Sequence, residues 1–338
     1  MAVIRYARVA ALVAGLWAAT GAGAANDPVA EEAAVRERSI ESFQQLLSKY
    51  PESSMRAPVL LLLGDLYAER EKSRYLAEVG RAETGGTPES APALDYTEAI
   101  GAYEEVAALG AEFAGSVEAL HALGVCYDEM GRADEAERVL AQASGLTADP
   151  ALRASSLLRL GDLRFSRENW PGALDAYRAA DEAGADAAAE KLDYRIGWCH
   201  LKQGELEEAR ARFAAALDGA LRGDPGSRPE ESLSEILRSL ALVQVQTDPS
   251  DPEGFAARFP DGPCRRAALV EFGEVLLEHD RPEYGERALR QALSMDRQAA
   301  DAPEVHDHIV EALSAEERKR EAGAEMEKFV ERYAPGGD

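Results

Sequence analysis

The stretch Leu123-Gly124-Val125-Cys126-Tyr127 decides the fold, because a near copy, Leu63-Gly64-Asp65-Leu66-Tyr67, precedes it. Related pairs follow downstream, at Leu160-Gly161, Ile196-Gly197 and Phe272-Gly273. Gly124 and Gly161 are 37 residues apart, and Gly161 and Gly197 are 36 apart. A period in the thirties is typical of stacked helical hairpins. The sequence therefore predicts an all-α solenoid, an architecture that presents an extended binding surface.

The residues around each glycine follow one order of types. The clearest unit has Leu120, Leu123, Gly124, Tyr127, Gly131, Ala136, Leu140 and Ala143. The next units have Leu157, Leu160, Gly161, Ala173, Tyr177 and Ala180, then Ile196, Gly197, His200, Gly204, Ala209, Phe213 and Ala216. This order resembles the tetratricopeptide repeat (TPR) family, although Arg164 replaces an expected tyrosine. The resemblance implies that small residues sit where two helices cross and that aromatic residues fill the gap to the next hairpin.

The other segments extend the array in both directions. Residues 27–50 are expected to form a capping helix, and the pattern as a whole predicts about fifteen helices in a TPR-like α-solenoid. Gly64 precedes Ala99 by 35 residues, whereas Gly124 precedes Ala136 by 12, which indicates an insert at about 71–94. The insert is either a tolerated loop or a functional one. We expect an N-terminal array at 25–221, a linker at 222–231 and a more degenerate array at 232–338.

Residues 1–24 are typical of a secretory signal peptide. Arg5 and Arg8 form a positive start, Val9 to Ala19 are apolar, and Ala22-Gly23-Ala24 provides a small-residue cleavage site. The predicted mature chain starts at Ala25 and is periplasmic or secreted. The alternative is an uncleaved membrane anchor. No later apolar run approaches the ~20 residues of a membrane-spanning helix.

The charge of the chain excludes some partners. The net charge is −25, and removal of the two arginines in residues 1–24 leaves −27. A protein that binds nucleic acid needs a basic stripe on its surface, and one that binds anionic lipid needs a polybasic segment. This acidic chain is therefore expected to bind neither. The excess of acid either keeps the chain soluble or favours basic partner segments.

No catalytic or metal-binding motif is present. The chain lacks a phosphate loop, a Gly-x-Ser-x-Gly elbow and a His-Glu-x-x-His pair. His306 and His308 are two residues apart on a predicted helix, so they point in opposite directions. Cys126 and Cys199 are predicted to be small buried hydrophobes, while Cys264 is the thiol expected to be reachable. We therefore expect no enzyme activity, no cofactor and no metal, with an enzyme of unknown class as the least favoured alternative.

The TPR resemblance gives the binding surface a location, because the first helix of each TPR hairpin lines a concave groove. The groove positions selected in this way are His121, Asp128, Leu158, Asp162, Phe165, Lys191, Tyr194 and Trp198. Phe165, Tyr194 and Trp198 would form an aromatic floor flanked by the two aspartates. This arrangement favours a protein or peptide partner with a basic or amphipathic segment. The alternative is that these side chains pack against neighbouring helices. Trp170 is interpreted as a packing residue of a hairpin turn.

The style of the repeats resembles exported TPR proteins of bacterial envelope machines. The resemblance implies a non-catalytic scaffold or adaptor of the cell envelope that binds a partner segment in the groove. The alternative is an accessory subunit of a secretion, pilus or outer-membrane assembly machine, which would use its convex face or its insert. Either protein would be a monomer or a subunit of a larger complex.

Overall fold

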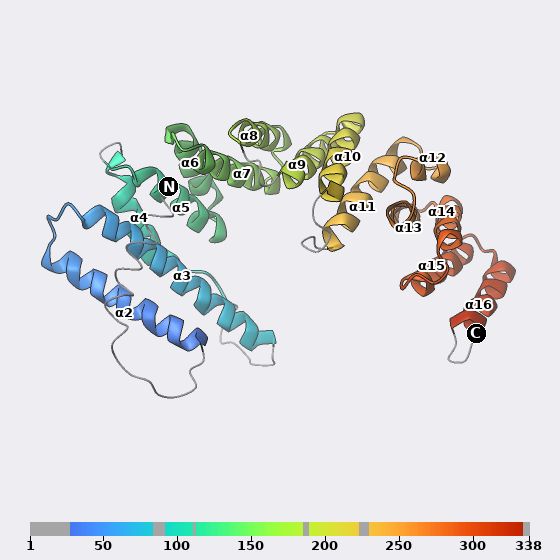
Figure 1. Ribbon diagram of the computed structural model, residues 1–338, viewed down its shortest axis with the longest axis horizontal. Helices are drawn as coiled ribbons and strands as arrows, with labels where there is room; N and C mark the ends of the chain where they lie inside the picture. The colour runs from blue at the N-terminus through green and yellow to red at the C-terminus, as the bar shows by residue number, and fades with distance from the viewer. Residues whose placement is uncertain (1–27, 84–91, 111–112, 185–188, 223–229, 334–338) are drawn as a thin grey trace. The chain divides into compact units, whose positions relative to one another are not determined.

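The computed structural model describes residues 28–83, 92–110, 113–184, 189–222 and 230–333 (Figure 1). Within these ranges the chain forms fifteen helices, α2 to α16, and no strand, which confirms the predicted all-α class. The predicted signal peptide lies outside the described residues, as do residues 223–229 of the predicted linker. The chain divides into two compact units, Met1–Ala119 and Leu120–Asp338.

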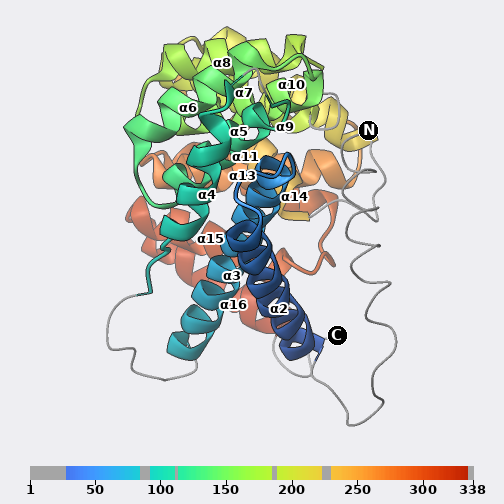
Figure 2. The ribbon, with the colours of Figure 1, turned by 90° about the vertical axis from the view of Figure 1, so that its left-hand side faces the viewer.

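The first unit contains α2 (Pro28–Lys49), α3 (Arg56–Glu83) and α4 (Thr97–Ala107). α2 and α3 run antiparallel and side by side (Figures 1 and 2). α3 continues to Glu83, so residues 71–83 of the predicted insert are helix, and only its later part, 84–91, lies outside the described residues. Arg74 supports this extension, because its Nη1 lies 2.7 Å from Oε1 of Glu78, one turn later.

The second unit is a series of helix pairs, and the division from the first unit falls within α5 (Ser116–Glu129). The other first helices are α7 (Pro150–Ser166), α9 (Ala189–Lys202), α11 (Glu230–Thr247), α13 (Pro263–Glu278) and α15 (Ala302–Ala315). The second helices are α6 (Ala133–Leu146), α8 (Trp170–Glu182), α10 (Leu206–Arg222), α12 (Pro252–Ala256), α14 (Pro282–Met295) and α16 (Lys319–Tyr333). α7, α9, α13 and α15 each pack against the second helix of the same pair.

The repeat glycines mark the points where paired helices cross. A Cβ atom at Gly64 would lie 2.5 Å from Cε1 of Tyr103, and one at Gly197 would lie 2.7 Å from the Phe213 ring. The same close approach joins Gly124 to Leu140, Gly161 to Tyr177 and Gly273 to Leu289. Any larger side chain would push the helices apart, which confirms the packing role predicted for these glycines.

Five hairpins of the second unit share one turn. A residue with positive φ ends each first helix, and these residues are Gly131, Glu168, Gly204, Asp280 and Glu317. The next residue donates its backbone N–H to the carbonyl five residues back, as Arg132 does to Tyr127 at 2.8 Å and Arg318 to Leu313 at 3.0 Å. The positive-φ residue itself donates to the carbonyl three residues back, as Gly131 does to Asp128 at 2.9 Å. Together the two hydrogen bonds form the Schellman motif. In four hairpins the positive-φ residue follows the repeat glycine by seven residues, which places Val310 at the glycine position of the last hairpin.

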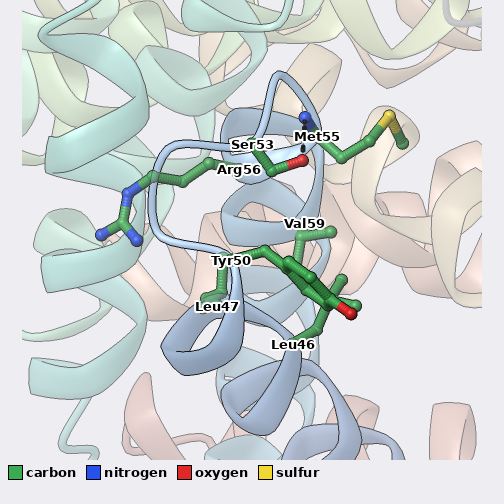
Figure 3. Close-up of a pocket in the computed structure, with 7 residues that line it drawn as sticks. All are labelled: Leu46, Leu47, Tyr50, Ser53, Met55, Arg56 and Val59. Atoms are coloured by element: carbon green, nitrogen blue, oxygen red, sulfur yellow. Dashed lines mark hydrogen bonds between the residues drawn. The ribbon is translucent and has the colours of Figure 1, made fainter.

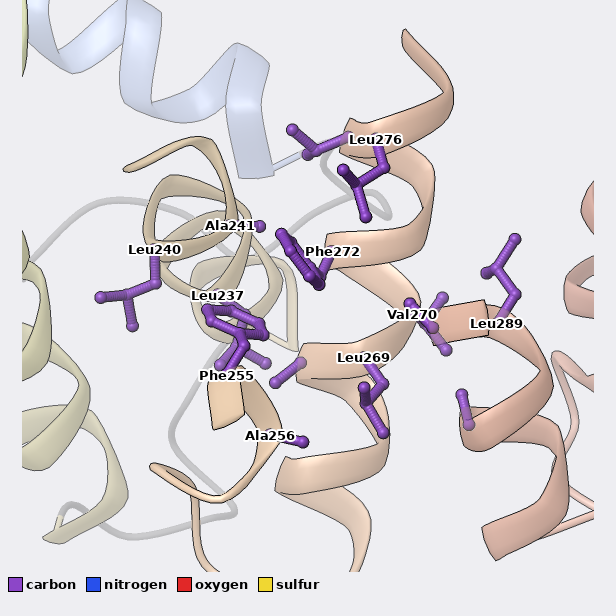
Figure 4. Packing of buried hydrophobic residues seen from close by; sticks show 14 of the residues in the cluster. Leu237, Leu240, Ala241, Phe255, Ala256, Leu269, Val270, Phe272, Leu276 and Leu289 are labelled. Carbon is purple, nitrogen blue, oxygen red and sulfur yellow. The ribbon is translucent and has the colours of Figure 1, made fainter. Parts of the chain in front are cut away.

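The core of the second unit is a hydrophobic cluster that includes residues from α10 to α16. Phe255 and Phe272 stack with ring centroids 4.5 Å apart, and Leu237 lies beside them (Figure 4). The short α12 contributes Phe255, which is 2% exposed, and so replaces a full second helix. Each large buried side chain of this kind contributes roughly 1.5–3 kcal/mol relative to exposure.

Candidate interaction surface

Two of the predicted groove residues, His121 and Asp128, are engaged by the next first helix. Nδ1 of His121 lies 2.9 Å from Oγ of Ser156, whose own hydroxyl donates to the Leu152 carbonyl. Nδ1 therefore carries the hydrogen of the neutral ring. Burial lowers the pKa of His121, and the nearby Arg159 lowers it further.

Asp128 faces Arg159 of α7, with Oδ2 3.4 Å from Nη1. Burial raises the pKa of the Asp128 carboxyl, and the guanidinium partly offsets that rise. The neighbouring Glu129 also pairs with Arg159, at 3.4 Å. Asp128 is therefore part of an ion pair between repeats and is not left free for a partner.

Asp162, the second predicted acid, has two partners. It accepts a hydrogen bond from the Tyr177 hydroxyl at 2.7 Å, and Nε of Arg195 lies 2.8 Å from the same carboxylate. Arg195 also donates from Nη2 to the second oxygen at 3.2 Å, which makes the pair bidentate. We expected this acid to flank an open groove, but its contacts join α7 to α8 and α9.

The aromatic residues Tyr194 and Trp198 are held on a buried ring. The Phe213 side chain is 0% exposed, and its centroid lies 5.7 Å from Tyr194 and 6.0 Å from Trp198. Tyr194 and Trp198 are themselves partly buried and lie 6.3 Å apart, edge to face. These rings therefore pack inward on the neighbouring helix and keep an exposed portion.

Phe165 contacts Trp170, the residue predicted to pack in a hairpin turn. Its centroid lies 4.7 Å from that of Trp170, at an interplanar angle of 67°. Trp170 is the first residue of α8, where the Asn169 side chain caps the helix by accepting from the Gly172 N–H at 3.1 Å. The ring is fixed at the turn and remains half-buried.

Lys202 links the aromatic residues, although it is not among the groove residues predicted from the sequence. Its Nζ lies 5.5 Å from the centroid of Trp198 and 5.9 Å from that of Trp170. The signal was available, because Lys202 stands four residues after Trp198 on a predicted helix, and such residues share a face. We call Phe165, Trp170, Tyr194, Trp198 and Lys202 the aromatic patch.

The remaining predicted residues lie at the margin of this patch. Leu158 is partly buried and packs on the small cluster that contains Leu192 and Ile196. Lys191 is exposed at the start of α9. The eight predicted residues thus separate into a paired polar group on α5 and α7, a packing leucine, and an aromatic group on α7 and α9 flanked by Lys191.

Other candidate sites are weaker. A surface pocket in the first unit is lined by Leu46, Tyr50, Met55 and Val59, among others (Figure 3). Its cavity volume is about 10 Å³, far below the roughly 300–1,000 Å³ of small-molecule sites. The described ranges contain no cluster of His, Cys, Asp and Glu suited to a metal ion.

The three cysteines are free thiols, and Cys126 and Cys199 are buried as predicted. Burial raises the pKa of Cys199 to about 12, so this thiol is unreactive near neutral pH. Cys264 is only half-buried, and burial raises its pKa as well. Across the described ranges, no helix is both long and apolar enough to cross a membrane.

Helix pairs that share a glycine crossing and a left-handed turn define the class of protein, an α-solenoid of helix–turn–helix repeats. Residues 93–161 and residues 192–218 match two family models, both described as tetratricopeptide repeat. The chain therefore contains tetratricopeptide repeats, as its sequence pattern predicted. TPR folds are typically non-enzymatic scaffolds for protein–protein interaction, and the fold supports that role here.

The chain is also similar to solved structures of other repeat proteins. The C-terminal part of a TPR repeat-containing protein from Cytophaga hutchinsonii is 14% identical, with 86% of this chain and 94% of that chain covered and a TM-score of 0.48. BtubC (BKLC) from P. vanneervenii is 14% identical, with 80% and 91% covered and a TM-score of 0.45. A TPR protein from Parabacteroides merdae is 13% identical, with 84% and 98% covered and a TM-score of 0.44. No curated protein matches this sequence.

Proposed function

We propose that this chain is a non-catalytic scaffold that binds a segment of a partner protein along the first helices of its TPR hairpins. The observation that carries the proposal is the aromatic patch on α7, α8 and α9. Its rings are anchored on buried Phe213 and on the α8 N-terminus, yet they keep exposed portions. Rigid aromatic side chains of this kind are the usual anchors of protein interfaces.

The partner segment that best fits this surface is amphipathic. The net charge of −25, taken alone, would favour basic partners. Asp128 and Asp162, however, already face Arg159 and Arg195, so neither presents an uncompensated charge. The aromatic rings supply apolar area, and an amphipathic segment would bury its apolar side against them.

The proposed location is the bacterial cell envelope, in the periplasm or outside the cell. This rests on the positive start, the short apolar run and the Ala22-Gly23-Ala24 site in residues 1–24. Mass spectrometry of the protein expressed in a bacterial host tests it. A mature chain starting at Ala25 in the periplasmic fraction is the expected result, and full-length protein in the cytosol would contradict it.

A second candidate is an accessory subunit of a secretion, pilus or outer-membrane assembly machine. The observation that favours it is the extension of α3 through residues 71–83, which carries the exposed Leu76. Deletion of residues 71–94 followed by co-purification separates the two candidates. Loss of the partner on deletion favours the accessory subunit, and retention favours the aromatic patch.

Recovery of partners from envelope extract tests the first candidate directly. Wild type is compared with Trp198→Ala and Tyr194→Ala. Tyr50→Ala is the matched control, because Tyr50 is a 51% exposed aromatic residue of the first unit. We expect the two patch variants to lose partners that the control retains. If Trp198→Ala and Tyr194→Ala recover the same partners in the same amounts as wild type, the proposal is wrong.

A further inference from the structure

The described charged side chains of α9 include an aspartate and an arginine in ion pairs, and two lysines without a carboxylate partner in the described part of the chain. Asp193 lies 2.8 Å from Nη1 of Arg212, and Arg195 pairs with Asp162. Lys191 and Lys202 have no carboxylate within ion-pair distance among the described residues. They are eleven residues apart, so they project from nearly the same side of the helix.

The side of α9 that carries the two lysines is the aromatic one. Lys191, Tyr194, Trp198 and Lys202 stand at spacings of three, four and four residues, which place them along one stripe. The stripe is therefore apolar at its centre and cationic at both ends. It stands out in a chain with 62 acidic and 37 basic residues.

The described acids closest to the stripe have contact partners of their own. Asp162 and Asp193 face arginines, and Glu205, just beyond the end of α9, has Oε2 2.5 Å from Nδ1 of His200. Lys202 makes cation–π contacts with Trp170 and Trp198. These contacts hold the ammonium group in place without cancelling its charge.

We propose that the α9 stripe binds a protein segment in which a large apolar side chain is flanked by Asp or Glu. The apolar side chain would contact Tyr194 and Trp198, and the flanking carboxylates would reach Lys202 and Lys191. Charge complementarity carries the choice of an acidic segment, because the two lysines have no carboxylate partner among the described residues, whereas Asp162 and Asp193 already face arginines. The inference rests on the proposed function and adds the chemistry of the partner to it.

Tryptophan fluorescence reports on this stripe directly. The chain has three tryptophans, so the full chain carrying Trp17→Phe retains only Trp170 and Trp198. It is titrated with three peptides that share a Leu-Phe-Leu centre and differ only in flanking residues, which are Glu, Gln or Lys. We expect the Glu peptide to change the emission and to bind most tightly. Added salt should weaken its binding.

Substitutions identify the residues involved. Lys202→Gln should weaken the Glu peptide by about two- to fivefold, as expected for one partly exposed ion pair. Lys202→Glu should shift the preference to the Lys peptide, and Trp198→Ala should weaken all three by about tenfold. Lys49→Gln is the matched control, because Lys49 makes a similar cation–π contact, 5.3 Å from the Tyr50 centroid, in the first unit. Circular dichroism checks that each variant is folded.

The outcomes separate the inference from the proposed function. If the Lys peptide binds wild type as tightly as the Glu peptide, and Trp198→Ala still weakens both, the acidic preference is wrong and the patch remains. If Trp198→Ala does not change the binding of any of the three peptides, both the acidic preference and the proposed function are wrong. If no peptide changes the emission or releases heat in calorimetry, the inference is overturned.

Discussion

The hydroxyl of Tyr177 donates a 2.7 Å hydrogen bond to Asp162, the residue that follows the repeat glycine. Tyr103 does the same to Asp65 at 2.7 Å. Where the second helix instead places Leu140 or Phe213 on the glycine, the following residue is apolar, Val125 or Trp198. The residue after the glycine is thus an aspartate where a tyrosine of the second helix packs on the glycine, and an apolar residue where Leu140 or Phe213 does. Glu274 departs from this rule beside Leu289, and its Oε1 lies 3.4 Å from Nδ1 of His308.

Removing the hydroxyl of Tyr177 should destabilise the second unit. Tyr177→Phe keeps the ring on Gly161 but deletes the donor to Asp162, which retains Arg195. We expect a loss of about 1–2 kcal/mol in the free energy of unfolding, measured by urea denaturation. Tyr75→Phe is the control, because no hydrogen bond joins the Tyr75 hydroxyl to a described residue. Equal midpoints for the two variants would contradict the assigned role.

The tyrosine–aspartate pair of Tyr177 and Asp162 can be introduced into the next hairpin by substitution. Phe213→Tyr places a hydroxyl beside Trp198, which offers no acceptor, and should cost about 1–3 kcal/mol. Adding Trp198→Asp supplies the carboxylate that Tyr177 has in the preceding hairpin. A double-mutant cycle should then give a favourable coupling of about 0.5–3 kcal/mol. A coupling of zero would show that the match is coincidental.

The crossing glycines should tolerate no methyl group. Gly64→Ala brings a Cβ within 2.5 Å of the Tyr103 ring and should destabilise the first unit by about 1–3 kcal/mol. Gly101→Ala is the matched control in α4, where an added Cβ meets nothing within 4 Å. It should be neutral or stabilise by up to about 1 kcal/mol, because alanine favours helix. Thermal or urea unfolding measures both, and destabilisation by the control would undermine the steric explanation.

Acid should weaken the last hairpin through His306. This side chain is 1% exposed, between Phe329 and Tyr333, with Nε2 2.9 Å from Oε1 of Glu325. Burial lowers the pKa of His306 from 6.5, although Glu325 acts in the opposite direction. The unfolded chain therefore takes up this proton more readily, and stability is lost as pH falls below about 6.5. The groups facing the ring also include Arg290 and Arg332.

His306→Phe should reduce that loss, measured as the difference between urea midpoints at about pH 7.5 and about pH 5.5. His121, whose pKa is also lowered, should account for a remainder of the same sign. His279→Gln, which removes an exposed histidine and leaves the surroundings of His306 intact, serves as the control. A distinct loss below pH 4.5 belongs to Glu325, whose pKa Arg290 and Lys328 hold at about 2 despite burial. An unchanged midpoint difference in His306→Phe would remove His306 from this account.

Most of the fold was predictable because its determinants are local and repeated. The glycine and the residue that crosses it recur at near-constant spacing, as in Gly161 with Tyr177 and Gly197 with Phe213. The last hairpin was harder to place in register, because Val310 occupies the glycine position and only the turn at Glu317 reveals it. The extension of α3 was predicted as part of a turn insert, because spacing alone does not distinguish a longer helix from a longer loop.

The candidate surface was predictable only in part. Helical periodicity placed Tyr194 and Trp198 on one face, and the structure puts their rings 6.3 Å apart. Periodicity within one helix does not reveal partners on the next. The pairing of Asp162 with Arg195 and the contact of Trp170 with Lys202 both join residues more than thirty positions apart. For that reason the sequence suggested exposed acids, where the structure shows paired acids and two lysines without a carboxylate partner among the described residues.

The left-handed turn recurs 37 residues apart at Gly131 and Glu168, and again at Asp280 and Glu317. The two turns of each pair share one backbone geometry, so a chain cut at one turn can be rejoined at the other without a new loop. An in-frame duplication or loss of the segment between them would add or remove a whole hairpin while leaving the others closed as before, because each repeat packs mainly on its neighbours. The number of hairpins, and with it the length of partner that such a chain can span, is therefore open to change by recombination alone.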